Sequence, residues 1–400
     1  MAATRRNGGA PAEAAALPKL SVVVPVFNGV SDFGRCLDAL AASPASPAWE
    51  LVVVDDGSTD GSADAARAIG AWLLQTAHPR SGPAAARNLG ASAARGELLL
   101  FIDADVVVRP ETIRRMVGAF GADPAPAAVF GSYDTRPGAP NFVSQYKNLL
   151  HHFVHQVSRP EATTFWSGCG AIRRSVFLEL GGFDPDYRRP SIEDIELGCR
   201  LTRAGYSVRL RRDIQVGHLK RWTPASLLVS DIRDRGIPWT KLMLRERAFT
   251  TDLNLRKENR VSVACVALLW LVLAGAAVRP MLAWGALPLA ALLIGLNAAL
   301  YGFFRRQRGF RFMLAAIPWH WLYYTYNGLC LVVGALALLR PAERRRAGSR
   351  PEGPVRLLHD HAPHGVDGQD PVANGDRANG RGVDRRSARP QGAGYVEVPT

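Results

Sequence analysis

Residues Leu20–Phe27 read LSVVVPVF, a short and almost unbroken run of β-branched residues. Such a run is typical of a strand that is buried on both faces of a parallel sheet. Further strands are predicted at ELVVVDD (Glu50–Asp56), around Ala71–Gln75, and at ELLLFIDAD (Glu97–Asp105). Helices are predicted between them, at Asp32–Ala42, after the turn GSTDGS, and at Gly82–Arg95. This alternation predicts a doubly wound α/β sheet.

Acidic residues stand at the ends of two of these strands. Asp55 and Asp56 end the second strand, and Asp103 and Asp105 follow the fourth. Ligands of doubly wound sheets bind outside the carboxyl ends of the strands. The two acidic pairs therefore mark the predicted site.

Charge and cysteine content restrict the class of protein. The net charge is +14, but the arginines fall mainly beside apolar segments and near the C-terminus. That placement favours anionic lipid headgroups over nucleic acid as the partner. The five cysteines are scattered without a CxxC pair. This pattern argues against a disulfide framework and a zinc site, and it fits a reducing compartment.

Three long apolar runs follow the α/β region, at Val261–Val278, Met281–Phe304 and Phe312–Leu339. The first two have the length of membrane spans, and the basic loop Arg305–Arg311 favours a cytoplasmic return. The third is interrupted by Pro318 and is too long for one crossing and too short for two. We predict that it forms an interfacial helix followed by a re-entrant or kinked piece.

Four regions are therefore expected along the chain. Residues 1–18 are predicted to be a disordered leader without the apolar segment of a signal peptide. Residues 19–250 are expected to form the α/β domain, and residues 256–340 a membrane region of two or three helices. Residues 341–400 contain too few apolar residues to fold and are predicted to be a disordered tail.

Five motifs occur in order between Leu20 and Leu244. They are SVVVPVFN (Ser21–Asn28), VVVDDGSTDGS (Val52–Ser62), ARNLGASAARGE (Ala86–Glu97), FIDAD (Phe101–Asp105), and GGFDPDY with EDIELGCRL (Gly181–Tyr187, Glu193–Leu201). Together they resemble glycosyltransferase family 2, whose members have the GT-A fold, a doubly wound mixed sheet. The resemblance implies a hexosyltransferase that uses a nucleotide-sugar donor.

The pair Asp103 and Asp105 suits a divalent cation. A hard cation held by one or two carboxylates bridges the oxygens of a diphosphate and stabilises it as a leaving group. By the resemblance this is the DxD-type element, with Asp105 as the direct ligand of Mn²⁺ or Mg²⁺. His218 is a further candidate ligand, although a lone histidine is more often structural. The alternative for the acidic pair is a solvated end of a strand.

Other residues are expected to bind the donor. The resemblance implies that Asp56 contacts the nucleobase and that Pro25 and Phe27 line its pocket. Asp55 is a second candidate, but we expect one of the two carboxylates to hold the turn or cap the next helix instead. Arg87 is placed by the resemblance near the diphosphate, where a guanidinium is favourable. Its alternative is an exposed helix arginine.

Transfer of a sugar to a hydroxyl requires a group that accepts the hydroxyl proton. Asp194 corresponds to the base of inverting members of the family, so the resemblance implies direct displacement with inversion. The alternative is that Asp194 belongs to an acidic first turn with Glu193 and Glu196, which the helix dipole favours.

The acceptor is expected to be lipid-linked or a glycan close to the membrane, because a soluble acceptor requires no anchor. Processive synthases of the family carry a QxxRW element, whereas Ser230–Trp239 reads SDIRDRGIPW. Single transfer is therefore preferred over polysaccharide synthesis. A transporter with a regulatory nucleotide-binding domain is disfavoured, since the apolar runs contain no acidic residue. A catalytic domain on the cytoplasmic side of a multi-pass inner-membrane protein is expected.

Overall fold

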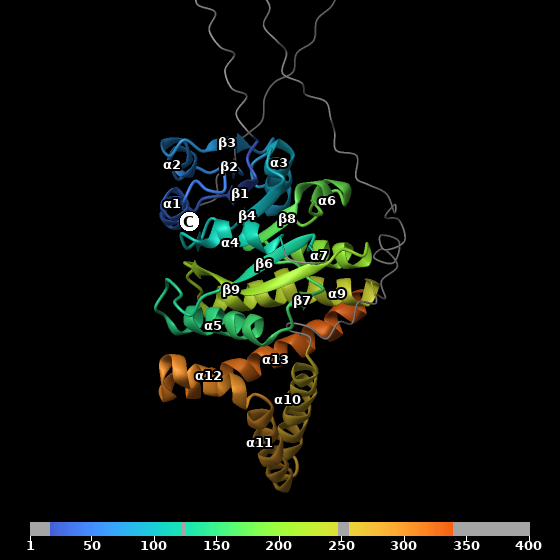
Figure 1. Ribbon diagram of the computed structural model, residues 1–400. Coiled ribbons are helices and arrows are strands. Elements are labelled where there is room, and N and C mark those ends of the chain that lie inside the picture. Colours follow the sequence, from blue (N-terminus) through green and yellow to red (C-terminus); the bar gives the residue numbers. More distant parts are fainter. Residues whose placement is uncertain (1–16, 122–124, 247–255, 339–400) are drawn as a thin grey trace, which may run out of the picture. The chain divides into compact units, whose positions relative to one another are not determined.

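The computed structural model describes residues 17–121, 125–246 and 256–338. The predicted tail, and all but the last two residues of the predicted leader, lie outside these ranges. Figure 1 labels the elements that are used below.

The N-terminal part alternates strands and helices as predicted. Its strands are β1 (Leu20–Val26), β2 (Trp49–Asp55), β3 (Trp72–Gln75) and β4 (Leu98–Ile102), and its helices are α1 (Val30–Ala41), α2 (Ser62–Ala68) and α3 (Pro83–Ala93). β1 pairs in parallel with both β2 and β4, and β2 pairs in parallel with β3. Val22, Val23 and Val24 of β1 are fully buried. Both faces of the strand are therefore covered, which explains its continuous apolar sequence.

The second part adds antiparallel strands. It contains β5 (Val106–Val107), α4 (Thr112–Ala119), β6 (Ala128–Tyr133), α5 (Phe142–Val157), β7 (Glu161–Ala162), β8 (Cys169–Arg173), α6 (Arg174–Glu179), α7 (Glu193–Arg203) and β9 (Val208–His218). The strand order is β3-β2-β1-β4-β8-β6-β9-β5, with β7 beside β9 (Figure 1). β8 runs antiparallel to β4 and β6. The mixed sheet that we predicted is confirmed.

The register of the sheet places the acidic residues at one edge. Val26 of β1 pairs with Asp55 at the end of β2, and Val23 pairs with Phe101 near the end of β4. The N–H of Asp103 donates to the carbonyl of Gly168, just before β8 begins. Parallel strands end at the same edge, and β8 starts there because it runs the opposite way. Segments far apart in sequence thus meet at this edge.

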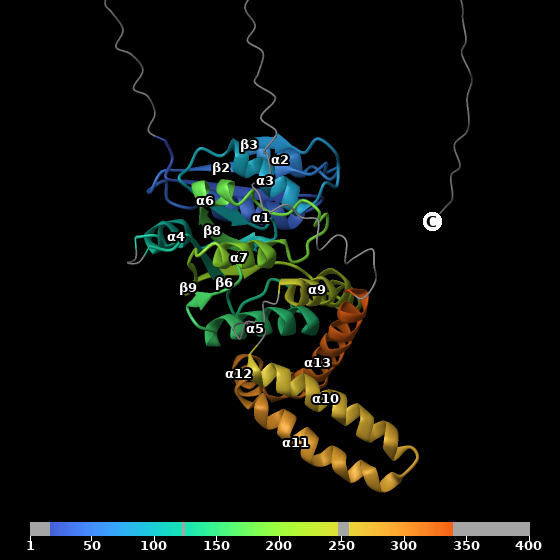
Figure 2. The same cartoon turned by 90° about the vertical axis from the view of Figure 1, so that its right-hand side faces the viewer.

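The remaining elements are helical. They are α8 (Pro224–Val229), the π-helix η1 (Ser230–Gly236), α9 (Ile237–Glu246), α10 (Lys257–Ala276), the 3₁₀ helix η3 (Pro280–Gly285), α11 (Ala286–Leu296), α12 (Ala298–Arg308) and α13 (Phe310–Leu338). By length and composition, α10 and α13 are able to cross a membrane. The segments Pro280–Leu296 and Ala298–Arg308 qualify as a third span only as a pair bent by 65°. α10 and α11 run side by side (Figure 2).

Two details of this region correct the sequence analysis. The run Met281–Phe304, predicted as one span, breaks at Asn297, and the run predicted to break forms the single helix α13. The Asn297 amide donates to the carbonyl of Leu293 and to Ser262 Oγ, and its oxygen accepts from Tyr324. An asparagine that bonds the backbone in this way competes with the helical ladder. Pro318 removes only one backbone hydrogen bond from a long helix.

Candidate active site

A cavity of about 1070 Å³ opens at the carboxyl edge of the sheet. Its lining includes most of the residues predicted for the site, namely Pro25, Phe27, Asp56, Arg87, Asp103, Asp105, Asp194 and His218. Residues of α5, η1, α9 and α13 also line it. The structure thus gathers into one space residues that are up to 302 positions apart in sequence, from Pro25 to Asn327.

The two aspartates after β2 have different surroundings. Asp55 lies outside the lining of the cavity, and its carboxylate accepts from the Ser58 N–H at 2.9 Å and from Gln75. Asp55 therefore holds the turn, the role that we expected for one member of the pair. Asp56 lines the cavity and accepts from the N–H groups of Ser81 and Gly82 at 2.9 and 2.8 Å. It fixes the loop beside the predicted base pocket.

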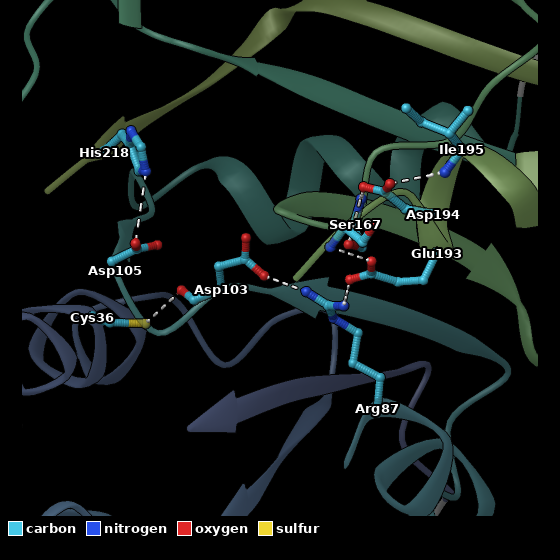
Figure 3. Close-up of polar contacts among 10 residues, drawn as sticks. Cys36, Arg87, Asp103, Asp105, Ser167, Glu193, Asp194, Ile195 and His218 are labelled. Carbon is cyan, nitrogen blue, oxygen red and sulfur yellow. Dashed lines mark hydrogen bonds and ion pairs between the residues drawn. The ribbon is translucent and has the colours of Figure 1, made fainter. Parts of the chain in front are cut away.

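Arg87 connects two parts of the site. Its guanidinium donates to Asp103 Oδ1 at 2.6 Å and to Glu193 Oε1 at 2.9 Å (Figure 3). Arg87 is 4% exposed, so it is not the surface arginine of the alternative interpretation. Burial by itself lowers the pKa of Arg87, but the charges of Asp103 and Glu193 outweigh it and hold the pKa above its ordinary value. Arg87 therefore stays charged and ties the end of β4 to the start of α7.

Asp105 and His218 both line the cavity, and their side chains face each other. Asp105 Oδ2 lies 3.7 Å from His218 Nε2 (Figure 3). The pairing of Val106 with His218 at the end of β9 creates this contact, and the ring of Tyr133 stacks on His218 at 4.1 Å. Burial raises the pKa of Asp105, but His218 and Lys220 outweigh it and lower the pKa to about 2. Asp105 is therefore a carboxylate at neutral pH.

Asp194 is oriented by Ser167. Its Oδ2 accepts from the N–H of Ser167 at 3.1 Å and from its hydroxyl at 3.3 Å, while Oδ1 accepts from the Ile195 N–H. Desolvation and the neighbouring Glu193 charge raise the pKa of Asp194 to about 6. Asp194 is thus the second residue of α7 and also a carboxyl group of raised pKa in a cavity, a combination typical of functional sites.

Sequence reasoning missed the partners of the predicted residues. Ser167 lies in the glycine-rich stretch before β8, but nothing in its sequence indicates contact with Asp194. Close packing makes that contact: a Cβ on Gly198 of α7 would lie 2.2 Å from the backbone nitrogen of Phe165. Only glycine lets α7 approach this segment so closely. Glu193, the partner of Arg87, was considered only as part of an acidic helix start.

The donor atoms at Asp105 and His218 suit a cation that also binds phosphate oxygens and water better than a cation held by protein groups alone. Within residues 17–121, 125–246 and 256–338, no group of three or more His, Cys, Asp and Glu side chains is arranged to hold a metal ion. Mg²⁺ in nucleotide enzymes is usually held by one or two carboxylates together with phosphate oxygens and water. Asp105, with His218 beside it and Asp103 nearby in sequence, offers such an incomplete set.

Comparison with known proteins identifies the family of the N-terminal part of the chain. The model of the family described as Glycosyl transferase family 2 matches residues 21–181. These residues belong to glycosyl transferase family 2. The match covers β1 to α6 and includes Asp56, Arg87, Asp103 and Asp105. Together with the mixed sheet, it confirms the predicted GT-A fold class.

Individual relatives cover part of the chain. Validoxylamine A glucosyltransferase of Streptomyces hygroscopicus subsp. limoneus is 30% identical over 51% of this chain and 52% of its own. Pre-mycofactocin glycosyltransferase of Mycobacterium tuberculosis is 32% identical over 50% of this chain and 42% of its own. The chain spans about half the length of these curated relatives. A solved structure of the mannosyltransferase PcManGT from Pyrobaculum calidifontis, with GDP-Man and Mn²⁺, is 20% identical over 84% of each chain, with a TM-score of 0.41.

Proposed function

We propose that this protein is an inverting hexosyltransferase that moves one sugar from a nucleotide-sugar to a lipid-linked or glycan acceptor at a membrane surface. The observation that carries the proposal is the composition of one cavity. It is lined by Pro25 and Phe27 near β1, by a carboxylate pair at the end of β4, and by a separate carboxylate of raised pKa, Asp194. Donor binding and proton acceptance require these groups in one space.

The donor nucleotide is assigned to the end of the cavity near β1. Phe27 is 40% exposed, which leaves a ring face for a base, and the Arg80 guanidinium lies 5.3 Å from the centre of that ring. Asp56 keeps acceptor capacity for a nucleobase N–H, because a carboxylate has about four acceptor positions. Basic residues supply positive charge for a diphosphate along the lining, namely Arg80, Arg188, Arg189, Lys220 and Arg221.

A divalent cation, Mn²⁺ or Mg²⁺, is proposed as the cofactor. Asp105 would hold it, with His218 and Asp103 as further candidates. When bound, it neutralises charge on the leaving diphosphate. Arg87 keeps Asp103 in a fixed position, since it is buried and hydrogen-bonded to both Asp103 and Glu193.

Asp194 is the proposed base. The acceptor oxygen forms a bond to the anomeric carbon while the bond from that carbon to the diphosphate oxygen breaks. The hydroxyl proton passes to the Asp194 carboxylate. Ser167 fixes Oδ2, so the orientation of the carboxylate is set before the acceptor arrives. Because the sugar carbon is attacked directly by the acceptor, its configuration inverts.

The proposed location is the cytoplasmic face of the inner membrane. Two helices, α10 and α13, have the length and composition of membrane spans. Nucleotide-sugars are cytoplasmic, which places the donor site on that side. The basic segment Arg305–Arg311, which spans the end of α12 and the start of α13, agrees with this orientation by the positive-inside rule.

A panel of labelled nucleotide-sugars tests the proposal. Membranes that contain the full chain should consume one or a few of these donors and label an acceptor with a single sugar. Membranes that contain the Asp194→Asn variant should not. A ladder of products would support a polysaccharide synthase instead, and no donor consumption across the panel would contradict the proposal.

A further inference from the structure

One part of the cavity is lined by residues that belong neither to the predicted donor site nor to the predicted base. We call it the inner compartment. Its lining comes from four helices and comprises Lys147 and His151 of α5, Arg235 of η1, Trp239 of α9, and Tyr323 and Asn327 of α13.

One ion pair in this compartment is already neutral. Lys147 Nζ lies 2.6 and 2.9 Å from the two oxygens of Asp231, and the Tyr326 hydroxyl donates to Oδ2 of Asp231 at 2.7 Å. Asp231 is 6% exposed. The three side chains satisfy one another and join α5, η1 and α13. They leave no net charge for a ligand.

Arg235 has no such partner. It lies on η1 four residues after Asp231 and is only partly exposed. None of the hydrogen bonds or ion pairs formed among the described residues involves its guanidinium. A guanidinium has five N–H donors, and leaving a charge unpaired in a partly enclosed space is costly. Arg235 therefore presents to the cavity a guanidinium whose N–H donors have no hydrogen-bond partner among the described residues.

A second unsatisfied nitrogen lies in the same compartment. His151 Nε2 is buried and has no hydrogen-bond partner. Burial lowers the pKa of His151 well below its ordinary value, and the positive charge of Arg235 contributes in the same direction. His151 is therefore neutral, and either ring nitrogen is free to carry the proton. A guanidinium and an imidazole N–H together suit an oxyanion.

The outer wall of the compartment indicates what carries that oxyanion. Tyr323 and Asn327 belong to α13, one of the two candidate membrane spans. Gly236, directly after Arg235, packs against Cys330 of the same helix. α13 also carries exposed apolar side chains toward its end, among them Leu329 and Val332, which are 60% and 56% exposed. An amphiphile is therefore able to place a polar head in the compartment and an apolar chain along α13.

We infer that the inner compartment binds the phosphate head of a lipid acceptor through Arg235 and His151, an inference that rests on the proposed function. Phosphate is the oxyanion of membrane lipids, and arginine binds it bidentately. The lipid chain follows α13 into the bilayer. The acceptor hydroxyl of the group that the lipid carries then shares the cavity with Asp194.

Binding of short prenyl compounds to the full chain in detergent tests this inference without a donor. Farnesyl phosphate should bind more tightly than farnesol, its uncharged counterpart. The Arg235→Gln variant should weaken the binding of farnesyl phosphate by about 10- to 100-fold, the range for a hydrogen bond to a charged group, and leave farnesol unchanged. Arg235→Lys keeps the charge but loses the planar guanidinium, so its affinity for farnesyl phosphate should lie between those of the unchanged protein and Arg235→Gln.

Arg233→Gln is the matched control, because Arg233 lies on the same helix, is paired with Asp234 and is outside the cavity lining. It should bind farnesyl phosphate as the unchanged protein does. Equal affinity for farnesyl phosphate and farnesol, or no effect of Arg235→Gln, would overturn the inference. Equal affinity for inorganic phosphate and farnesyl phosphate would replace the lipid with a free anion.

Two further readouts separate this inference from its rivals. Arg235 also lowers the pKa of Asp194. If Arg235→Gln shifts the pH profile of transfer but not the binding of farnesyl phosphate, Arg235 tunes the base and the lipid site is wrong. Nucleotide-sugar binding is measured separately. If no nucleotide-sugar binds, the proposed function is contradicted. If a nucleotide-sugar binds but prenyl phosphate does not, only this inference is contradicted.

Discussion

Ser167 donates both its backbone N–H and its hydroxyl to one carboxylate oxygen of Asp194. The two residues come from different elements, the segment before β8 and the first turn of α7. Hydrogen bonds to a carboxylate favour its charged form, while burial opposes it. The balance leaves Asp194 with a pKa of about 6, above its ordinary value. This balance leads to the first two predictions.

Replacing Asp194 by asparagine should lower the rate of transfer by about two to four orders of magnitude, because the amide cannot accept the proton. Nucleotide-sugar binding should change little, since asparagine keeps the shape of the side chain and the proposed donor-binding residues are unchanged. Steady-state kinetics and donor binding measured on the same preparation check both statements. A collapse of donor binding with substantial remaining turnover would place Asp194 in the donor site or in helix capping.

Transfer should lose activity on the acid side with an apparent pKa of about 6. Asp194 must be ionised to accept a proton, and burial with the Glu193 charge raises its pKa from 3.8 to about 6. The rate should therefore fall about tenfold per pH unit below that value. Ser167→Ala removes one donor to the carboxylate and should move the acid limb to higher pH. An acid limb near pH 4 in both proteins would contradict the assignment.

Removal of divalent cations should abolish donor turnover, and Mn²⁺ or Mg²⁺ should restore it. Asp105→Ala should have the same effect without unfolding the protein, whereas Asp55→Asn, which alters a residue outside the cavity, should keep the dependence on the cation. Turnover before and after exhaustive dialysis against EDTA is the measurement. Full activity in EDTA would remove the cation from the mechanism.

Lys147→Met should destabilise the protein by about 3–5 kcal/mol, because it leaves the buried carboxylate of Asp231 without its cation. The exposed pair Arg233 and Asp234 provides a contrast: Arg233→Met should cost no more than about 1 kcal/mol. Unfolding of both variants in the same detergent gives the comparison. Equal stability of the two would mean that the Asp231 charge is compensated by other groups.

The sequence was sufficient for β1, β2 and β4, because these strands are buried on both faces and carry almost continuous apolar runs. It was also sufficient for most residues at their ends, since parallel strands finish at the same edge. The cavity residues Pro25, Phe27, Asp56, Arg87, Asp103, Asp105, Asp194 and His218 follow from this and from the family motifs.

Contacts between segments that are distant in the chain could not be predicted from the sequence. The bond from Ser167 to Asp194 depends on the close approach of α7, and the unpaired state of Arg235 depends on how α5, η1 and α13 meet. The apolar runs predict helices but not their breaks. Asn297 breaks one because its side chain finds partners in Leu293, Ser262 and Tyr324, whereas Pro318 does not break another.

The most direct test of the account is transfer from labelled nucleotide-sugars by the full chain in membranes, compared with the Asp194→Asn variant at equal amounts of folded protein. We predict that the unchanged protein transfers a single sugar to a membrane-associated acceptor. The variant should bind the same donor and transfer at about one hundredth of the rate or less. Equal transfer by both proteins, or no donor bound by either, would contradict the account.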